Sequence, residues 1–371
     1  TTLYHLIFVV KIKIIMKVCI LGGGLVSLTL AKALINLKVN VDIFSNYKTE
    51  NQNKIRTIGI SKNNVDFFNK HILNIEKILW NINKIEIYNE KFIKDKLINF
   101  EDKKEPLFSL IKNYKLFNLL HTKINKNNFV KFIDKKNNLT SISDKYNLII
   151  NCDLNSQITK KYFYKELSKD YKSYAHTTII EHQKLENNTA KQIFTKKGPL
   201  AFLPISNKET SIVYSAKEEK NINFKNIIDK YNSKYQISKI KNISSFKLRS
   251  SNLRSYRYKN ILAFGDLLHR IHPLAGQGFN MTLRDIYELI KLIKLKLDLG
   301  LDLDKSICSD FEKNIKHKNY IFSNSIDFIY EFFNLESKFK NNILSKSIQF
   351  FGKNKLLNNS LKKFADQGFN T

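Results

Sequence analysis

Apolar positions near the start of the chain follow the order strand, turn, helix, strand. Residues 17–21 (KVCIL) form a short apolar run that ends at Gly22-Gly23-Gly24. An apolar segment with helical periodicity continues to Leu37, and a second apolar run (VNVDIF) occupies residues 39–44. A buried strand that leads through a glycine-rich turn into a helix is typical of the first unit of a Rossmann-type domain. We therefore predict such a unit at the start of the chain.

The rest of the chain changes repeatedly between strand and helix patterns. Alternation of apolar and polar residues predicts strands at 82–101, 128–134, 145–151 and across most of 172–250. A buried strand is predicted at 261–266, and helices at 107–126, near 224–236, at 277–299 and after Gly300. The sustained alternation in 172–250 favours an antiparallel sheet that could cover a ligand.

These elements predict an α/β fold with three parts. The predicted Rossmann-type domain is discontinuous and combines residues 16–81, 102–171 and 251–300. The predicted substrate domain is an inserted antiparallel β-sheet made of residues 82–101 and 172–250, and residues 301–371 form a C-terminal helical region. We interpret residues 1–15 as an upstream extension, because Met16 immediately precedes the first strand.

Conformationally special residues gather in one late segment. Residues 265–285 (GDLLHRIHPLAGQGFNMTLRD) hold three of the 11 glycines, and five of the six arginines lie between 249 and 284. Residues this rare are expected where backbone geometry or a planar donor is required. Together with the early glycines, this segment predicts one ligand site assembled from both ends of the chain. Arg249, Arg254 and Arg257 fit either a surface position or a role at a cofactor phosphate or substrate entrance.

Charge and cysteine content narrow the choice of partners. The net charge is +30, but lysine and asparagine are spread almost evenly along the chain, without the basic stripe of a nucleic-acid-binding protein. We therefore predict no nucleic-acid partner, whereas attraction to an anionic membrane surface remains open. Cys19, Cys152 and Cys308 form no CxxC pair, and no stretch resembles a membrane span. These features predict a cytoplasmic protein, with peripheral association with the inner membrane as an open alternative.

The early glycines predict a dinucleotide site. In GGGLVSLTLAKAL, Gly22 makes the tight turn and Gly24 lets the backbone approach a pyrophosphate at the helix N-terminus. Ser27 takes the third glycine position and is small enough for close packing of helix and strand. Ser45 stands at the end of the second strand, where an acidic residue normally accepts ribose hydroxyls, and the strand parity of Asp42 directs it elsewhere.

The late segment resembles a known signature. GDLLHRIHPLAGQGFNMTLRD is similar to the GD…HP.AGQG.N.G..D signature of class A flavoprotein hydroxylases related to p-hydroxybenzoate hydroxylase. It most resembles the branch that hydroxylates polyprenylated phenols in ubiquinone biosynthesis. RTIGIS at 56–61, KGPLAFLP at 197–204 and ADQGF at 365–369 agree with segments of the same branch.

The resemblance implies that the Rossmann-type domain binds FAD. Asp266, after Gly265, would bind the ribityl chain, and Pro273 with the 276–278 turn would border the isoalloxazine ring. Leu203-Pro204 would lie in the sheet on the substrate side. The residues expected to bind the cofactor are Gly22, Gly24, Ser27, Ser45, Arg56, Asp153, Gly265, Asp266, Pro273, Gly276, Gln277, Gly278 and Asn280.

Two departures from the family pattern affect the adenosine half and the reductant site. The DG motif ascribed to FAD and NAD(P)H handling appears as CDLNS at 152–156, which keeps Asp153 but has Leu154 in place of the glycine. The arginine expected on the helix near residue 117 is replaced by Phe117, although Lys115 could supply a charge.

His269 and His272 have the HxxH spacing of some metal sites. No Cys, Asp or Glu ligand accompanies them and Pro273 breaks a helix, so we predict no metal. His269 is expected to pack on the turn. His272, with Pro273, is the candidate catalytic position at the flavin ring.

The predicted function is that of an FAD-dependent monooxygenase. The resemblance implies NAD(P)H as co-substrate, O2 activation through a flavin hydroperoxide, and a lipophilic phenolic substrate of ubiquinone biosynthesis. Membrane-surface association and a biosynthetic complex are the expected partners. Two alternatives remain: a degenerate member that serves as a structural partner in such a complex, and a flavoprotein reductase on the same fold.

Overall fold

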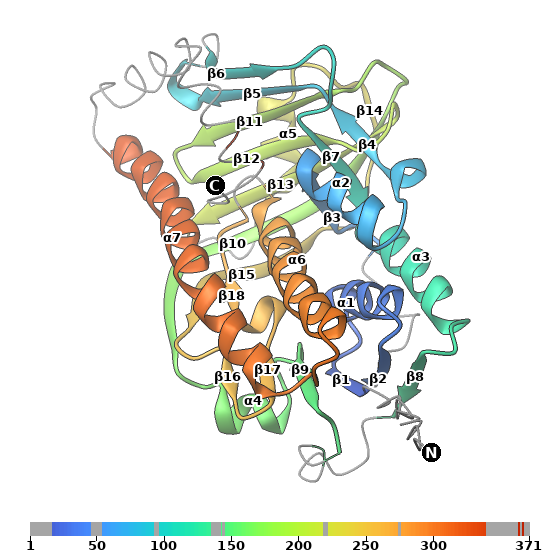
Figure 1. Ribbon diagram of the computed structural model, residues 1–371. Helices are drawn as coiled ribbons and strands as arrows, with labels where there is room; N and C mark the ends of the chain where they lie inside the picture. The colour runs from blue at the N-terminus through green and yellow to red at the C-terminus, as the bar shows by residue number, and fades with distance from the viewer. Residues whose placement is uncertain are drawn as a thin grey trace, which may run out of the picture.

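A computed structural model describes residues 17–45, 54–92, 96–134, 142, 145–217, 222–273, 276–338, 363 and 366. The predicted upstream extension at 1–15 lies outside the described residues, as does most of the ADQGF segment. Figure 1 shows two sheet regions joined by helices, with the long helix α7 along one side.

The first sheet is built around the predicted Rossmann unit. Strand β1 (Lys17–Leu21) pairs in parallel with β2 (Asn40–Phe44), and helix α1 (Leu25–Asn36) connects them, which confirms the predicted order. Parallel pairing continues on both sides of these two strands, and only the edge strand β16 is antiparallel. The sheet order is β16 (Arg257–Tyr258), β17 (Ile261–Ala263), β9 (Leu148–Asn151), β1, β2, β8 (Val130–Ile133).

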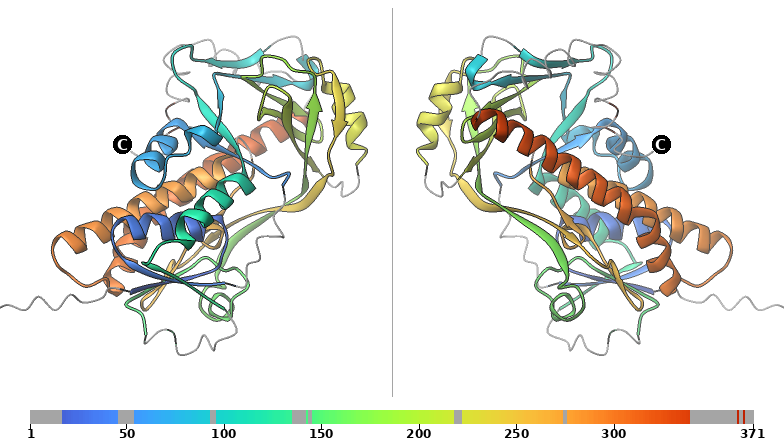
Figure 2. Two further views of the ribbon diagram at one scale, coloured as in Figure 1. Left: turned by 90° about the vertical axis from the view of Figure 1, so that its right-hand side faces the viewer. Right: turned by 90° about the vertical axis from the view of Figure 1, so that its left-hand side faces the viewer.

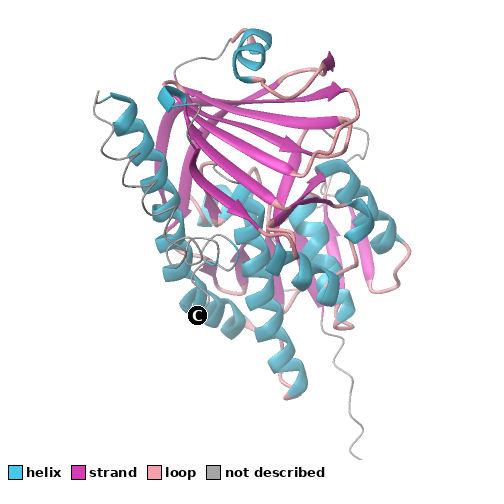
Figure 3. Ribbon diagram, turned by 90° about the horizontal axis from the view of Figure 1, so that it is seen from above, coloured by secondary structure: helices cyan, strands magenta, loops and turns pink. Residues whose placement is uncertain are grey.

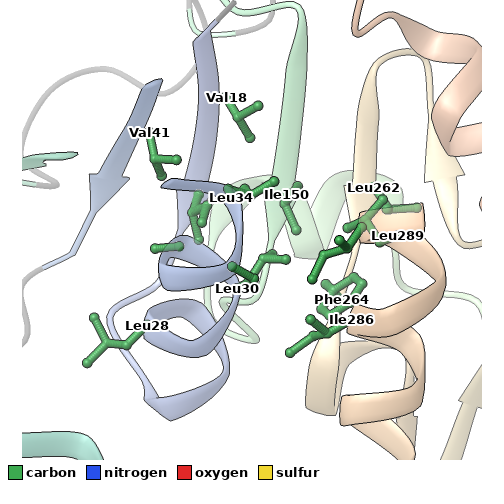
Figure 4. Packing of buried hydrophobic residues seen from close by; sticks show 14 of the residues in the cluster. Val18, Leu28, Leu30, Leu34, Val41, Ile150, Leu262, Phe264, Ile286 and Leu289 are labelled. Carbon is green, nitrogen blue, oxygen red and sulfur yellow. The ribbon is translucent and has the colours of Figure 1, made fainter. Parts of the chain in front are cut away.

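The core of this domain lies between the parallel sheet and two helices. Figure 4 shows Leu30 of α1 and Ile286 of α6 (Gln277–Asp298) directed toward Ile150 and Leu262 of the sheet. All four side chains are at most 1% exposed. Burying one such side chain contributes about 1.5–3 kcal/mol, so the apolar faces of α1 and α6 fix both helices on the sheet. Their N-termini are thereby held on the same domain.

The second sheet has nine strands and forms the broad layer seen in Figure 3. Strands β5 and β6 join it through a parallel pairing of β5 with β11 and an antiparallel pairing of β5 with β6. They therefore lie in one sheet with strands from 172–250, whereas Ile82 belongs to β4 of a separate small sheet. The later part of the large sheet begins at Glu166, a few residues before the predicted start at 172. Its order is β18 (His269–Arg270), β15 (Ser244–Leu253), β10 (Glu166–His182), β13 (Glu209–Lys217), β12 (Gly198–Pro204), β11 (Thr189–Thr195), β5 (Lys84–Asn89), β6 (Lys96–Glu101), with β14 (Ile237–Ile240) paired to β10.

A small three-stranded sheet connects the two regions. Its order is β3 (Thr57–Ser61), β7 (Phe108–Lys112), β4 (Trp80–Ile82). The predicted helix at 107–126 is therefore wrong in its first turn, because α3 begins only at Asn113 and ends at Asn125. Strands pair with β7 on both sides, and this pairing outweighs the helical pattern of the local sequence.

The remaining helices are short except for the last. They are α2 (Lys62–His71), α4 (Gln157–Tyr162), α5 (Phe224–Tyr231), the 3-10 helices η2 (Glu76–Ile78), η3 (Glu90–Phe92) and η5 (Gly265–Leu267), and α7 (Lys305–Lys338). Helix α5 is shorter than the predicted 224–236. Helix α7 confirms the helical pattern after Gly300 and packs along α6, as Figure 2 shows. None of the described helices has the length and apolar character that crossing a bilayer requires.

Candidate cofactor site

The first glycine of the early turn is required by the protein itself. Gly22 has φ +111°, and a Cβ there would stand 3.3 Å from the Ser27 Oγ and 3.4 Å from the Cys152 carbonyl carbon. Side chains rarely adopt this backbone conformation, so only glycine makes the turn without strain. Ser27 is buried against the turn, where its small size permits the close approach of α1 to β1 that the sequence predicted.

Gly24 is different, because nothing in the protein requires a glycine there. Its φ of −78° and ψ of 179° are ordinary extended values, and no atom lies within 4 Å of a Cβ built on it. It is exposed and forms the N-cap of α1 without a side-chain hydrogen bond. Backbone N–H groups at such a helix start attract an anion, and a glycine keeps the approach clear.

The GD turn meets the start of α1. Gly265 has φ +65°, and a Cβ on it would stand 3.0 Å from the Val26 Cγ1. The next residue, Asp266, is exposed beside this contact. The two glycine clusters, from opposite parts of the chain, are therefore neighbours, as the sequence predicted. A carboxylate here can accept hydrogen bonds from ligand hydroxyls.

The N-terminus of helix α6 is the next candidate part of the cofactor site. Gly276 is its N-cap in the left-handed conformation with φ +65°, and Gly278 has no atom within 4 Å of a built Cβ. Both are exposed, whereas Gln277 between them is buried and its Oε1 has no hydrogen-bond partner. Among the described residues, this helix start has the open surface and the unused polar atom expected where a ligand binds.

Asn280 holds α6 against the small sheet. Its Oδ1 accepts hydrogen bonds from the Ser61 backbone N–H at 2.9 Å and the Asn64 Nδ2 at 3.0 Å. Its Nδ2 donates to the Gly59 carbonyl at 3.0 Å and the Gly276 carbonyl at 3.3 Å. The amide that the sequence assigned to cofactor binding is thus fully used within the protein. Its contribution in this structure is to position the start of α6 beside β3.

These features fit FAD at the phosphate, ribityl and ring positions. Gly24, Asp266, Gly276 and Gly278 are exposed, and the helix starts that they flank lack acidic residues in the first turn. The N-terminus of α1 suits the pyrophosphate, and Asp266 suits the ribityl hydroxyls. The N-terminus of α6 suits negative charge on the ring. We call Gly24, Asp266, Gly276 and Gly278 the cofactor strip.

At the expected adenosine end of the FAD site, the acidic residue that would accept ribose hydroxyls is missing from the end of β2. Asp42 faces away from the strip, accepting a hydrogen bond from the Tyr146 hydroxyl at 2.5 Å and pairing with Lys17 at 2.7 Å. This confirms that its parity directs it elsewhere. Ser45 is half-buried at the end of β2, and its N–H donates to the Ile133 carbonyl at 3.1 Å. Within residues 40–45, no carboxylate therefore faces the position of an adenosine ribose.

The two other predicted contacts, Arg56 and Asp153, lie on separate elements. Arg56 is exposed immediately before β3, and Asp153 follows β9 with its backbone N 3.5 Å from a Cβ built on Gly22. The Asp153 carboxylate accepts the Asn155 N–H at 2.9 Å, so it shapes the altered DG segment as a turn.

Cys152 lies beside the glycine turn, with its carbonyl carbon 3.4 Å from a Cβ built on Gly22. Burial raises the pKa of its thiol to about 12, and the thiol hydrogen-bonds the Ser27 side chain. It therefore remains protonated and unreactive at neutral pH. Neighbouring Asp153 and Asp266 also raise this pKa. No local sequence signal could have found this contact, because it depends on the packing of β1 against β9.

His272 is buried against aromatic side chains and has no polar partner among the described residues. Its ring stacks on Tyr330 with centroids 4.1 Å apart and meets the edge of Tyr171 at 5.0 Å. It is 1% exposed, and neither ring nitrogen has a hydrogen-bond partner. Burial, with a smaller effect of Lys169, lowers its pKa to about 3. A ring that stays neutral and unpartnered is poorly suited to proton transfer, so the catalytic assignment of His272 stays a prediction.

His269 packs on the GD turn as expected. Its Nε2 hydrogen-bonds Asp285 Oδ2 at 2.5 Å, and Asp285 Oδ1 accepts the Asn319 Nδ2 at 3.0 Å. This buried group joins β18, α6 and α7. The described residues contain no group of three His, Cys, Asp or Glu side chains that could hold a metal ion. The two histidines of the HxxH spacing contact different partners: His269 hydrogen-bonds Asp285, and His272 packs against Tyr171 and Tyr330.

Comparison with known proteins agrees with this geometry. Residues 202–298, which include the GD turn and all of α6, match the FAD binding domain family. Over these residues the chain is similar to that FAD-binding family. The match also includes the end of β12 and all of β13 in the large sheet.

Two relatives show the same likeness over part of the chain. The ubiquinone biosynthesis monooxygenase COQ6, mitochondrial, of Dictyostelium discoideum is 32% identical over 117 residues, covering 31% of this chain and 22% of that protein. COQ6 of Rattus norvegicus is 27% identical over 169 residues, covering 34% and 36%. The matches thus span about a fifth to a third of these relatives.

Solved structures show the fold over nearly the whole chain. p-Nitrophenol 4-monooxygenase PnpA from Pseudomonas putida has a TM-score of 0.76 at 11% identity, covering 96% of this chain and 99% of that chain. PqsL, a probable FAD-dependent monooxygenase from Pseudomonas aeruginosa, has a TM-score of 0.71 at 14% identity, covering 90% and 99%. The fold is therefore that of FAD-dependent monooxygenases.

Acid sensitivity tests the environment of His272. Its folded-state pKa lies below the ordinary value of 6.5, so the folded state disfavours the charged ring. The stability gained from a neutral His272 is complete above pH 6.5 and is lost as the pH falls toward 3. Between pH 7.5 and pH 5, the wild type should lose about 2 kcal/mol more unfolding free energy than His272→Phe. Urea titrations at both pH values measure this; equal losses would contradict the buried neutral ring.

Proposed function

We propose that this chain is an FAD-dependent monooxygenase that uses NAD(P)H and O2 to hydroxylate a polyprenylated phenol in ubiquinone biosynthesis. The cofactor strip carries the proposal, because a side chain built on Gly24 or Gly278 would meet no atom of the protein within 4 Å. The names of the two COQ6 relatives support the reaction class and the pathway.

Different residues of the cofactor strip would bind different parts of FAD. The N-terminus of α1 would hold the pyrophosphate beside Gly24, and Asp266 would accept hydrogen bonds from the ribityl hydroxyls. The N-terminus of α6 would stabilise negative charge at the flavin ring, since its backbone dipoles are already oriented. FAD, when bound, supplies the transfer of electrons from NAD(P)H and the activation of O2.

The small sheet and the large sheet supply an apolar environment near the ring end. Gly59 of β3 lies 3.6 Å from a Cβ built on Gly276, and Phe108 of β7 lies 3.5 Å from one built on Gly59. Phe108, Trp80 and Leu203 are partly buried members of one hydrophobic cluster between these sheets. Such surroundings favour an aromatic substrate over a charged one and help to exclude water from the reaction.

Two measurements on the purified protein test the proposal. The first is the visible absorption spectrum after FAD is added and free FAD is removed, with Asp266→Ala as the matched control. The second follows NADH or NADPH oxidation with a short-chain prenylated phenol, using mass spectrometry to detect a hydroxylated product. We expect bound flavin in the wild type, less in Asp266→Ala, and product that depends on O2.

The alternatives give different results in these measurements. A structural partner would show no flavin absorption at any FAD concentration. A reductase would bind flavin and oxidise NAD(P)H without forming a hydroxylated product. Either outcome would overturn the hydroxylase proposal while leaving the fold unchanged.

A further inference from the structure

A groove runs between the end of β15 and the N-terminal half of α7. Its volume is about 610 Å³, and the side chains of Leu167, Leu253, Tyr256 and Tyr320 form its apolar walls. No residue of the cofactor strip lines it. The groove therefore belongs to a different surface from the candidate cofactor site.

The rim of this groove carries uncompensated positive charge. Arg254 and Lys313 line it and are exposed, and among the described residues neither of them pairs with a carboxylate. Glu312, the carboxylate in the lining, pairs with Arg257 at 3.3 Å and Lys316 at 3.4 Å. At neutral pH the groove therefore offers an apolar floor and a cationic rim.

Arg254 is notable because arginine is rare in this chain. Of the three arginines before the GD strand, Arg249 pairs with Glu166 and Arg257 pairs with Glu312. Arg254 has no such partner among the described residues. Of the roles left open by the sequence, a position at an exposed charged surface is the one that this placement supports.

The outer face of α7 extends the same surface. Tyr320 and Ile321 are each 47% exposed, and Phe328, two turns further along, is 68% exposed. Lys313 and His317 precede them at helical spacing on the exposed face. Figure 2 shows α7 on the outside of the molecule over its whole length. An exposed helix face that combines aromatic and aliphatic side chains with lysines is typical of surfaces that lie in a membrane interface.

We propose that the groove and this face of α7 form a docking surface for an anionic lipid bilayer. The apolar side chains would enter the headgroup region, and Arg254 and Lys313 would contact lipid phosphates. Symmetric pairing of two copies would place four like charges against one another, which disfavours a self-associating interface. A bilayer matches both the exposed apolar area and the missing negative charge. The proposal does not depend on the proposed hydroxylation.

The charge contribution is tested by vesicle sedimentation of the full chain loaded with FAD. The vesicles contain phosphatidylcholine alone or mixed with phosphatidylglycerol. The variant Arg254→Gln/Lys313→Gln is compared with Lys103→Gln/Lys104→Gln, which removes the same charge from exposed residues outside the groove. Each cation near an anionic bilayer contributes on the order of a fivefold gain in binding. We expect about 25-fold weaker binding for the first variant and a much smaller change for the second.

The contribution of apolar side chains to vesicle binding is tested with a matched pair of isoleucine variants. Ile321 and Ile243 are both 47% exposed, so Ile321→Ser and Ile243→Ser remove the same side chain from similar surroundings. Ile243 and Arg254 flank opposite ends of the ten-residue strand β15, roughly 30 Å apart. Only Ile321→Ser should weaken binding to anionic vesicles, and its effect should persist when salt screens the charges.

Several results would overturn this proposal. Equal binding to both kinds of vesicle would remove the charge argument, and equal losses in the groove and control variants would place the contact elsewhere. A dimer in solution that Ile321→Ser dissociates would make the face an interface between copies. Binding to an acidic protein without binding to vesicles would assign the surface to a protein partner. Because these measurements do not require turnover, failed hydroxylation leaves them interpretable.

Discussion

Gly24→Val is expected to abolish FAD binding while leaving the fold intact. The backbone at Gly24 has ordinary extended angles, and no atom lies within 4 Å of a built Cβ, so the protein can accept a side chain there. The same side chain would fill the space through which a pyrophosphate reaches the N-terminus of α1. We expect FAD affinity to fall by at least about a hundredfold, on the order of 3 kcal/mol. Fluorescence titration of the flavin-free protein with FAD measures the change.

A graded series separates this effect from damage to the helix. Replacing an N-cap glycine costs about 1 kcal/mol of unfolding free energy, because Val cannot serve as a cap. Gly24→Ala should therefore resemble Gly24→Val in stability but retain more FAD affinity. Gly22→Ala should instead destabilise the protein, since its φ of +111° strains any side chain. If Gly24→Val still bound FAD normally, the pyrophosphate would lie elsewhere.

The distinction between these glycines explains what the sequence could predict. Local patterns located the Rossmann unit correctly, because strand and helix periodicities at 17–44 arise from neighbouring residues. The same patterns could not separate Gly22, which the turn requires, from Gly24, at which nothing within the described protein requires a glycine. That difference depends on the position of Cys152 after another strand, and a single sequence does not reveal which segments meet there.

Elements that depend on distant pairing were predicted less well. The segment 107–112 was predicted as helix. In the structure most of it forms β7, which pairs with β3 and β4 as the central strand of the small sheet. Its apolar residues suit either structure, and only its neighbours decide between them. Likewise, the sequence grouped 82–101 with the large sheet, but nothing local indicated the parallel pairing of β5 with β11.

In the candidate site, too, features set by the local sequence were easier to predict than features set by distant contacts. The rarity of glycine in the chain was enough to bring Gly24, Gly265 and Gly276 together in one prediction. The functions of Asn280 and His272 were harder to predict, because each depends on partners from separate elements. Asn280 is saturated by β3 and α2, whereas His272 lies between aromatic rings of β10 and α7. Residue type alone indicated hydrogen bonding in both cases.

Asp285→Ala should cause the largest loss of stability of any change considered, although the sequence assigned Asp285 no role beyond its place in the signature. Its carboxylate is completely buried and accepts hydrogen bonds from His269 and Asn319. Removing it leaves two buried polar groups without an acceptor and removes these hydrogen bonds from α6 to β18 and α7. Breaking a buried pair of this kind costs about 3–5 kcal/mol. Urea unfolding at a fixed FAD concentration measures the loss, because bound cofactor itself raises apparent stability.

Four further variants, one of them His269→Phe alone, assign that loss to the buried contacts. Asp298→Ala removes an exposed carboxylate at the other end of α6 and should change stability by less than about 0.5 kcal/mol. Asp285→Asn keeps an acceptor and should lose less than Asp285→Ala. His269→Phe in the Asp285→Ala background should recover part of the loss, since it removes one of the unpaired groups. If the double variant were instead as unstable as the sum of the two single variants, His269 and Asp285 would act independently. The contact between β18 and α6 would then owe its stability to apolar packing alone.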